Sequence, residues 1–135
     1  KKYKYKSKNF KFLSKMTPVE INGAMKSSLF HVTTEDYIKA GFSNTFIQAC
    51  YQKKPTLSFN FDPGGFINKH KIGKFCNGSE KLFFNYFEQY LKNPKLVKKD
   101  GIKAYNFAKK EFDKDKIIKK IISTFKKLKK WKLLL

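Results

Sequence analysis

The residues with the clearest potential for chemistry lie at a loop that leads into a helix in the first half of the chain. Gly41, Phe42, Ser43 and Asn44 separate an apolar run from a segment with helical periodicity that starts at Thr45. Such a loop presents backbone N–H groups and the positive end of the helix dipole, which favour an anion. Glycine lets a ligand approach the backbone closely. The pattern predicts a phosphate site, and its alternative is an ordinary loop with a capping serine or asparagine.

The elements around this loop follow the order strand, loop, helix, strand. The first strand-like run spans 29–32, the helical segment spans 45–53 and the second strand-like run spans 55–60. An Asp-Pro-Gly-Gly turn at 62–65 comes next. Units of this kind build parallel sheets, and ligands bind outside the carboxyl ends of their strands. We therefore expect an α/β protein with its site at the 33–44 loop and the 62–65 turn.

This stretch resembles the donor-binding half of retaining glycosyltransferases of the GT-B architecture, the group 1 or family 4 class. In that family a strand is followed by E-G-F-P-N-x-x-x-E-A, a helix, a P-V strand and a glycine-rich turn. The chain reads A-G-F-S-N-T-F-I-Q-A from Ala40, P-T-L-S from Pro55 and D-P-G-G from Asp62. The resemblance is specific in this core and extends more weakly from about Phe10 to Leu128. It implies a single partial donor domain over residues 1–135, with a three-layer Rossmann-like fold, a short parallel sheet and a helical C-terminal end.

The resemblance also implies a substrate and a set of contacts. A nucleotide-diphosphate sugar would donate its sugar to a surface polysaccharide or glycolipid, and we expect no separate cofactor and no metal. Both glutamates of the family motif are replaced, by Ala40 and Gln48. A glutamine carbonyl can accept a ribose hydroxyl, but without the charge that makes such a bond roughly twice as strong. The donor-binding residues implied are Ala40, Gly41, Phe42, Ser43, Asn44, Thr45, Gln48, Gly64 and Gly65.

The two replacements leave the function open between three readings. A GT-B enzyme works in the cleft between two domains, so an active enzyme needs an N-terminal partner domain, and we expect no turnover by this chain alone. The family's donor domain also begins with a further strand and helix, which would lie before Lys1. The alternative is a catalytically inactive sugar-nucleotide-binding or scaffold module. A third, weaker reading is a basic adaptor at a membrane or nucleic-acid surface.

The composition limits the partners. The net charge is +21, and all 31 basic residues are lysine. Arginine supplies the planar fork that grips guanine edges and phosphates, so its absence argues against nucleic acid as a partner. A basic chain still attracts anionic membranes. Because no apolar run approaches the roughly 20 residues of a membrane span and the start lacks the apolar segment of a signal peptide, we expect a cytoplasmic protein, peripheral at the inner face of the cell membrane.

The cysteines and histidines carry no strong signal for chemistry. Cys50 and Cys76 lack the spacing of a metal site and are expected to be buried thiols. His31 falls within a strand and is expected to be a core histidine. His70 falls in a loop, with no carboxylate or cysteine spaced to complete a metal site.

Further strands and helices are predicted from local patterns. The run 10–16 has strand character and is expected to lie in one parallel sheet with the strands at 29–33 and 56–60. Thr17 and Glu20 form a capping box for a helix to about Ser27. Ile21, Ala24 and Met25 are expected to point inward from it. A short apolar piece follows at 74–76.

The second half of the chain reads as helical. Ser79 is expected to cap a helix through Leu91, Asn93 and Pro94 to begin another to about Lys110, and Asp113 to cap the last. The last helix carries an apolar stripe whose simplest role is to pack on the domain: Ile117, Ile118, Ile121, Ile122, Phe125 and Leu128. Trp131 and the three terminal leucines lie among lysines beyond it. They predict a tail that holds the protein reversibly at an anionic membrane.

Overall fold

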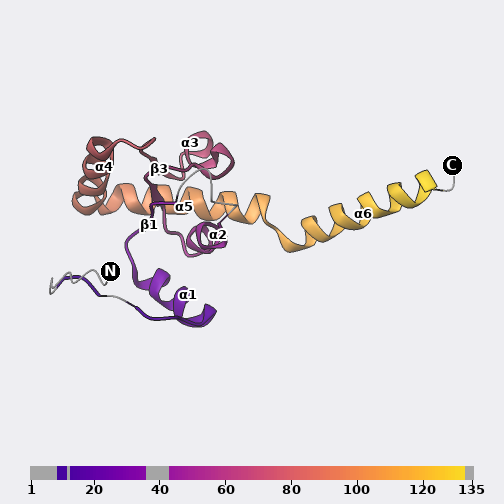
Figure 1. Cartoon of the computed structure of the whole chain (residues 1–135), viewed down its shortest axis with the longest axis horizontal. Coiled ribbons are helices and arrows are strands. Elements are labelled where there is room, and N and C mark those ends of the chain that lie inside the picture. Colours follow the sequence, from indigo (N-terminus) through magenta and orange to yellow (C-terminus); the bar gives the residue numbers. More distant parts are fainter. Residues whose placement is uncertain (1–8, 12, 36–42, 133–135) are drawn as a thin grey trace, which may run out of the picture.

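The computed structural model describes residues 9–11, 13–35 and 43–132, with side chains to residue 128, and shows an α/β protein (Figure 1). Its elements are α1 (Pro18–Ser27), β1 (His31–Thr33), α2 (Asn44–Tyr51), β2 (Thr56–Ser58), a 3₁₀ turn η1 (Pro63–Gly65), α3 (Phe66–His70), β3 (Gly73–Phe75), α4 (Glu80–Lys92), α5 (Pro94–Glu111) and α6 (Lys114–Lys132).

The sheet is small, open and entirely parallel, with strand order β1-β2-β3. Leu57 in the central strand pairs with Val32 on one side and Lys74 on the other. All three residues of β2 are buried, whereas the two outer strands are only partly covered. The predicted parallel pairing of the runs at 29–33 and 56–60 is therefore confirmed.

The predicted strand at 10–16 is wrong. Among its described residues none belongs to the sheet, and Phe10 and Leu13 remain about half exposed. The third strand is β3, which the sequence showed only as a short apolar piece and which lies on the far side of β2. Alternating apolar residues give a segment strand character, but they do not determine a pairing partner, and among the described residues β1 has a neighbour only on its β2 side.

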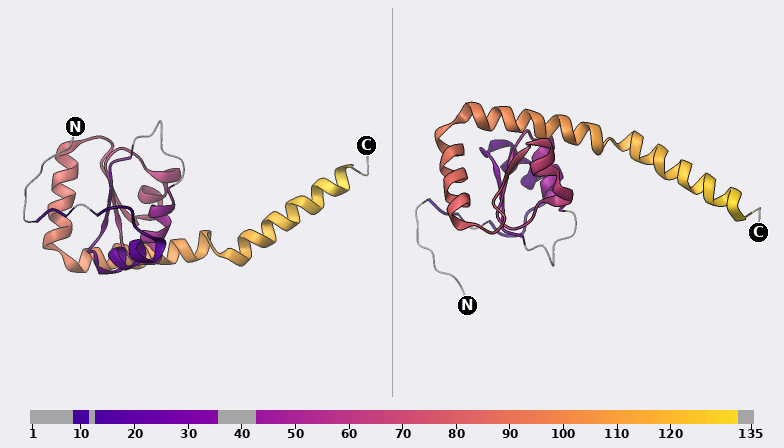
Figure 2. Two further views of the ribbon diagram at one scale, coloured as in Figure 1. Left: turned by 60° about the horizontal axis from the view of Figure 1, so that its bottom comes forward. Right: turned by 90° about the horizontal axis from the view of Figure 1, so that it is seen from above.

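Helices cover both faces of the sheet. Figure 2 shows α4 on one side of the strands and α2 with α3 on the other, while α5 runs across one end. That end is the amino-terminal edge, because Gly101 of α5 lies against the backbone of Lys53, just before β2. A Cβ atom at Gly101 would come within 2.1 Å of the Lys53 carbonyl oxygen. Glycine at this position lets α5 close the bottom of the sheet.

The main core lies between α2, α3 and α5. Its centre is Phe107, whose ring centroid is 5.0 Å from that of Phe66 and 6.5 Å from that of Phe46. The buried members of this core are Phe46, Cys50, Ile67, Ile72, Ala104, Phe107 and Ala108. Both cysteines are buried free thiols, as predicted, and burial raises the pKa of Cys50 to about 12.

An aromatic cluster fills the other face, beneath α4. The Phe30 ring lies 5.4 Å from Phe87 and 5.2 Å from Tyr90, and Phe59 lies 5.7 Å from Phe83. Tyr90 is the largest fully buried side chain of the described residues. The face of α4 that carries Phe83, Phe87 and Tyr90 therefore covers the sheet.

The predicted helix starts are confirmed by their caps. Thr17 and Glu20 form the capping box of α1, and the side chains of Ser79, Asn93 and Asp113 each accept a backbone N–H in the first turn of the helix that follows. The inward face predicted for α1 is only partly right. Ile21 and Met25 are half-buried, but Ala24 is exposed.

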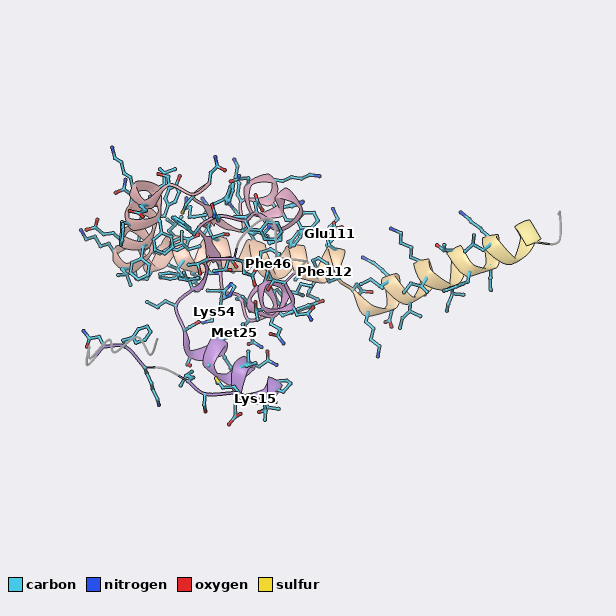
Figure 3. The ribbon with its side chains drawn as sticks, in the orientation of Figure 1. Lys15, Met25, Phe46, Lys54, Glu111 and Phe112 are labelled. Atoms are coloured by element: carbon cyan, nitrogen blue, oxygen red, sulfur yellow. The ribbon has the colours of Figure 1, made fainter. Side chains whose placement is uncertain are left out.

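The expected packing of the last helix on the domain is wrong. Figure 1 shows α6 leaving the α/β body and projecting away from it, and Figure 3 shows its side chains in open space. Every member of the predicted stripe is at least 40% exposed. None of the described helices combines the length and apolar composition that a bilayer crossing requires.

Candidate functional site

The carboxyl-terminal edge of the sheet is where the predicted site should lie, and backbone hydrogen bonds hold this edge together. The N–H of Phe59 donates to the Thr33 carbonyl oxygen at 2.9 Å, and the N–H of Cys76 donates to that of Ser58 at 2.9 Å. The segments that follow β1 and β2 thus start side by side. Three residues of the predicted site, Ala40, Gly41 and Phe42, lie outside the described residues.

The start of α2 carries the next four predicted residues. Ser43 is the N-cap residue, but its hydroxyl pairs with the Thr45 hydroxyl at 2.6 Å and makes no capping bond. Asn44 is exposed, Gln48 is half-buried on the second turn, and the first turn of α2 contains no acidic residue. This end of the helix therefore offers hydroxyl and amide groups next to the positive end of the helix dipole.

The turn from Asp62 to Gly65 has a clear structural role. The Asp62 carboxylate accepts the N–H of Ile67 at 2.8 Å and that of Asn68 at 3.1 Å, so it caps the start of α3. Gly64 and Gly65 have φ of 59° and 69°, which favour glycine, and both are exposed. Asp62 is thus committed to the fold. The Phe66 ring lies against Gly64, and the Gly65 N–H donates to the Asp62 carbonyl oxygen at 3.1 Å, but there is open space beside the Cα atom of Gly65.

Two segments of the predicted site therefore follow strands that are neighbours in the sheet. The start of α2 and the Gly64–Gly65 turn flank the carboxyl ends of the neighbouring strands β1 and β2. Neither segment carries a charged side chain among its predicted site residues. A ligand here would be held by backbone N–H groups, hydroxyls and amides.

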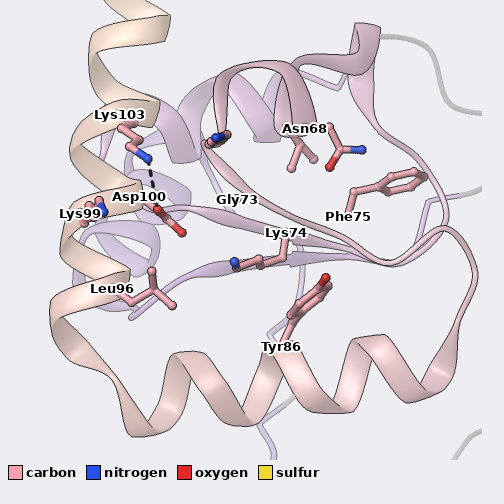
Figure 4. Close-up of a pocket in the computed structure, with 11 residues that line it drawn as sticks. Asn68, Gly73, Lys74, Phe75, Tyr86, Leu96, Lys99, Asp100 and Lys103 are labelled. Atoms are coloured by element: carbon pink, nitrogen blue, oxygen red, sulfur yellow. Dashed lines mark ion pairs between the residues drawn. The ribbon is translucent and has the colours of Figure 1, made fainter.

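A charged cavity that the sequence did not predict lies beside the edge strand β3. It has a volume of about 390 Å³ and opens between α3, α4 and α5 (Figure 4). Asp100 of α5 is buried at its wall, accepts the Tyr90 hydroxyl at 3.0 Å, and lies 4.0 Å from the Lys103 ammonium. Burial, followed by the Asp100 charge and hydrogen bond, raises the pKa of Tyr90 well above its ordinary value. Four lysines line the cavity: Lys71, Lys74, Lys99 and Lys103.

The cavity lysines come from α5, from β3 and from the turn after α3, which explains why they were missed. Lys99 and Lys103 are four residues apart on α5, a spacing that places both on one face. Lys74 comes from β3, where its ammonium lies 5.2 Å from the centre of the Tyr86 ring. Only the i, i+4 spacing was visible in the sequence, and lysine is too frequent in this chain for that spacing to stand out. With Asp100 held by Tyr90, the cavity has an excess of positive charge and suits a small anion.

Both histidines make contacts within the fold. His31 Nδ1 lies 3.2 Å from the Thr56 hydroxyl, and burial lowers its pKa, although the nearby Glu35 charge acts in the opposite direction. His70 packs on the Phe107 ring at 4.7 Å. Among the described residues no group of three or more His, Cys, Asp or Glu side chains is placed to hold a metal ion.

Comparison with known proteins gives no relative. No family model matches the chain, and neither the curated proteins nor the solved structures contain a match to it.

Proposed function

We propose that the chain is the donor-binding domain of a GT-B glycosyltransferase, with a Rossmann-like fold and a nucleotide-diphosphate sugar as its ligand. The observation that carries this proposal is the parallel order of β1, α2 and β2. In this order the start of α2 and the Gly64–Gly65 turn follow neighbouring strands at the carboxyl edge, where open α/β sheets bind ligands. Of the motif residues that suggested the family, Ser43 and Asn44 stand at the start of α2.

The chemistry of the edge suits a diphosphate. Its charge would be stabilised by the N-terminal end of α2, with the Ser43 and Thr45 hydroxyls as additional donors. A Cβ atom placed on Gly65 would meet no atom within 4 Å, so a ligand could approach the backbone there. Gln48, one turn further along α2, would accept a hydrogen bond from a ribose hydroxyl. Sugar transfer is assigned to an assembly in which a second, N-terminal domain closes over this edge.

A catalytically inactive module that binds sugar nucleotides is the second candidate. The observation in its favour is the absence of an acidic residue from the first turn of α2, together with glutamine at position 48. An amide holds the ribose more weakly than a carboxylate, because a charge-assisted hydrogen bond is roughly twice as strong as a neutral one. Binding without transfer is the expected behaviour of such a module.

A titration with uridine or guanosine diphosphate sugars, followed by backbone amide NMR shifts, tests the site. We expect weak binding, with shifts at Ser43–Gln48 and at Gly64–Gly65. Shifts confined to the lysines of the β3 cavity would place the anion elsewhere and contradict the proposal. The absence of any shift at millimolar ligand would contradict it as well.

A pair of charge-matched variants sharpens the test. Gln48→Glu should tighten binding several-fold, since it restores the charged acceptor of the family motif. Gln52→Glu adds the same charge at the far end of the same helix and should not tighten binding. The double change Ala40→Glu with Gln48→Glu should give the larger gain. No gain from either would mean that the inherited geometry is lost, which supports a scaffold role.

A further inference from the structure

The exposed face of α6 is the largest feature that the proposed function does not use. Its six large apolar side chains are between 40% and 67% exposed, with Phe125 the most open. At 100° per residue they fall on one sector of the helix, so they form one continuous stripe. The members of this stripe, called here the α6 stripe, are Ile117, Ile118, Ile121, Ile122, Phe125 and Leu128.

The rest of α6 is strongly basic. The 19 residues of the helix include nine lysines and a single acidic residue, Asp115. Helical spacing places five exposed lysines on the side opposite the stripe: Lys116, Lys119, Lys120, Lys126 and Lys127. A long apolar stripe backed by lysine is the pattern of a helix that lies in a membrane interface.

The base of α6 is attached to the body, while the helix itself is clear of it. The Tyr51 hydroxyl of α2 donates to the Phe112 carbonyl oxygen at 3.0 Å, and the Phe112 ring packs on Phe107 at 5.7 Å. These contacts fix the point at which α5 ends. Beyond that point α6 extends into open space in each view of Figures 1 and 2. The stripe is therefore presented by a helix with an anchored base.

We propose that the α6 stripe docks on an anionic lipid surface. The helix would lie parallel to the membrane over roughly 28 Å, from its length of 19 residues and the helical rise. The stripe would enter the boundary between headgroups and acyl chains, and the lysines would meet the anionic headgroups. This inference does not depend on the sugar-nucleotide site.

Charge favours a membrane over a second copy of the chain. Two copies of α6 packed through their stripes would bring eighteen lysines together against two acidic residues, twice the content of one helix. Such like charge opposes association, whereas an anionic leaflet offers the opposite charge over a wide area. The stripe also needs an apolar partner, which a lipid surface provides and a free polyanion does not.

Vesicle co-sedimentation of the full chain tests the proposal. We expect binding to phosphatidylcholine vesicles that contain phosphatidylserine, and at least tenfold weaker binding to pure phosphatidylcholine. Binding should fall at about 0.5 M salt, where the screening length is only roughly 4 Å. The double variant Lys119→Gln with Lys126→Gln should lower affinity by roughly fivefold for each lysine removed.

Two double variants that remove similarly exposed apolar side chains distinguish binding through the α6 stripe from nonspecific hydrophobic binding. Phe125→Ser with Leu128→Ser removes 67% and 59% exposed side chains from the α6 stripe and should weaken binding at least tenfold. Phe84→Ser with Leu91→Ser removes 66% and 51% exposed side chains from α4 and should leave binding unchanged. Circular dichroism checks that both variants keep their helices.

Several results would overturn the proposal. Unchanged binding by the α6 variant would leave only the net charge as the cause, and an equal loss in both variants would make the effect unspecific. The absence of binding to any vesicle would assign the stripe to a protein partner instead. Concentration-dependent dimerisation that the Phe125→Ser, Leu128→Ser variant abolishes, without lipid binding, would assign it to a second copy.

Discussion

The helices α5 and α6 follow one another in the chain and have similar patterns, but they end in opposite environments. Both have an apolar face and a lysine-rich face. In α5 the buried positions include Gly101, Ala104 and Ala108, small residues that let its backbone approach the end of the sheet and α2. The α6 stripe has only large side chains, and all are exposed. Periodicity therefore identifies an apolar face, while small residues on that face indicate that it packs closely on a neighbour.

The largest expected effect comes from matched leucine truncations in the two regions. Leu57→Ala should cost about 2–5 kcal/mol of unfolding free energy, because Leu57 is fully buried in the central strand and its loss leaves a cavity. Leu128→Ala in the α6 stripe should cost less than about 0.5 kcal/mol. Urea unfolding measures both. Comparable losses would mean that α6 is packed on the body.

A pair of glycine variants tests the close approach of α5. Gly101→Ala should destabilise the protein by about 1–3 kcal/mol, because the new methyl group would overlap the Lys53 carbonyl oxygen. Gly23→Ala, in the middle of the peripheral helix α1, meets no atom within 4 Å and should stabilise by about 0.5–1 kcal/mol through helix propensity. Thermal melts should show a lower melting temperature for Gly101→Ala and a higher one for Gly23→Ala. An unchanged melting temperature for Gly101→Ala would mean that α5 does not need glycine at this position to approach the sheet.

Removing the hydroxyl group of Tyr90 or of Tyr51 compares a hydrogen bond inside the α/β body with one at the point where the body meets α6. Tyr90→Phe removes the buried donor to Asp100 and should cost about 1–3 kcal/mol, since a buried carboxylate oxygen loses its partner. Tyr51→Phe removes the donor to the Phe112 carbonyl oxygen at the start of α6, where the tyrosine is 38% exposed and water can replace it. Its cost should be below about 1 kcal/mol. Equal losses of unfolding free energy, measured by chemical denaturation, would indicate that water is excluded from the Phe112 carbonyl oxygen as fully as from the core.

The smallest expected effect is a pH dependence of folding stability that arises from the α/β body and not from α6. Burial lowers the pKa of His31 in the folded protein, so the unfolded chain takes up a proton at higher pH than the folded chain. His31 therefore contributes stability above its unfolded pKa of about 6.5, and this stability is lost as the pH falls through the folded pKa. Melts between about pH 7.5 and 5.5 should show the decline, and His31→Gln should flatten it. A variant as pH-dependent as the parent would assign the decline to another group.

The sequence predicted local features well and long-range ones less well. The caps at Thr17, Ser79 and Asn93 depend on side chains within three residues of the helix start, so pattern alone identified them. The neighbouring parallel strands around α2 were also predicted, because a βαβ unit is a local motif. The run 10–16 failed because membership of a sheet depends on long-range pairing, which an alternating local pattern does not determine.

The candidate site divides in the same way. The start of α2 and the Gly64–Gly65 turn follow strands that are neighbours in the sheet, whereas Ala40, Gly41 and Phe42 of the predicted site lie outside the described residues. The lysine-lined cavity beside β3 could not be predicted, because Lys74 and Lys103 meet only after α5 has crossed the end of the sheet. The exposure of the α6 stripe was missed for a similar reason. The helical repeat shows that this helix has an apolar face, but it does not show whether another part of the protein covers that face.

Hydrogen exchange on the free full chain tests the contrast between α5 and α6 most directly. The amides of Ala104–Ala108 in the core of α5 should exchange only through global unfolding, and those of Ile118–Phe125 in α6 should exchange faster by a factor of roughly a hundred or more. A helix without tertiary packing opens easily, which is the reason for the difference. Equal protection of the two helices in the absence of lipid would contradict the account, because it would show that the α6 stripe is already covered.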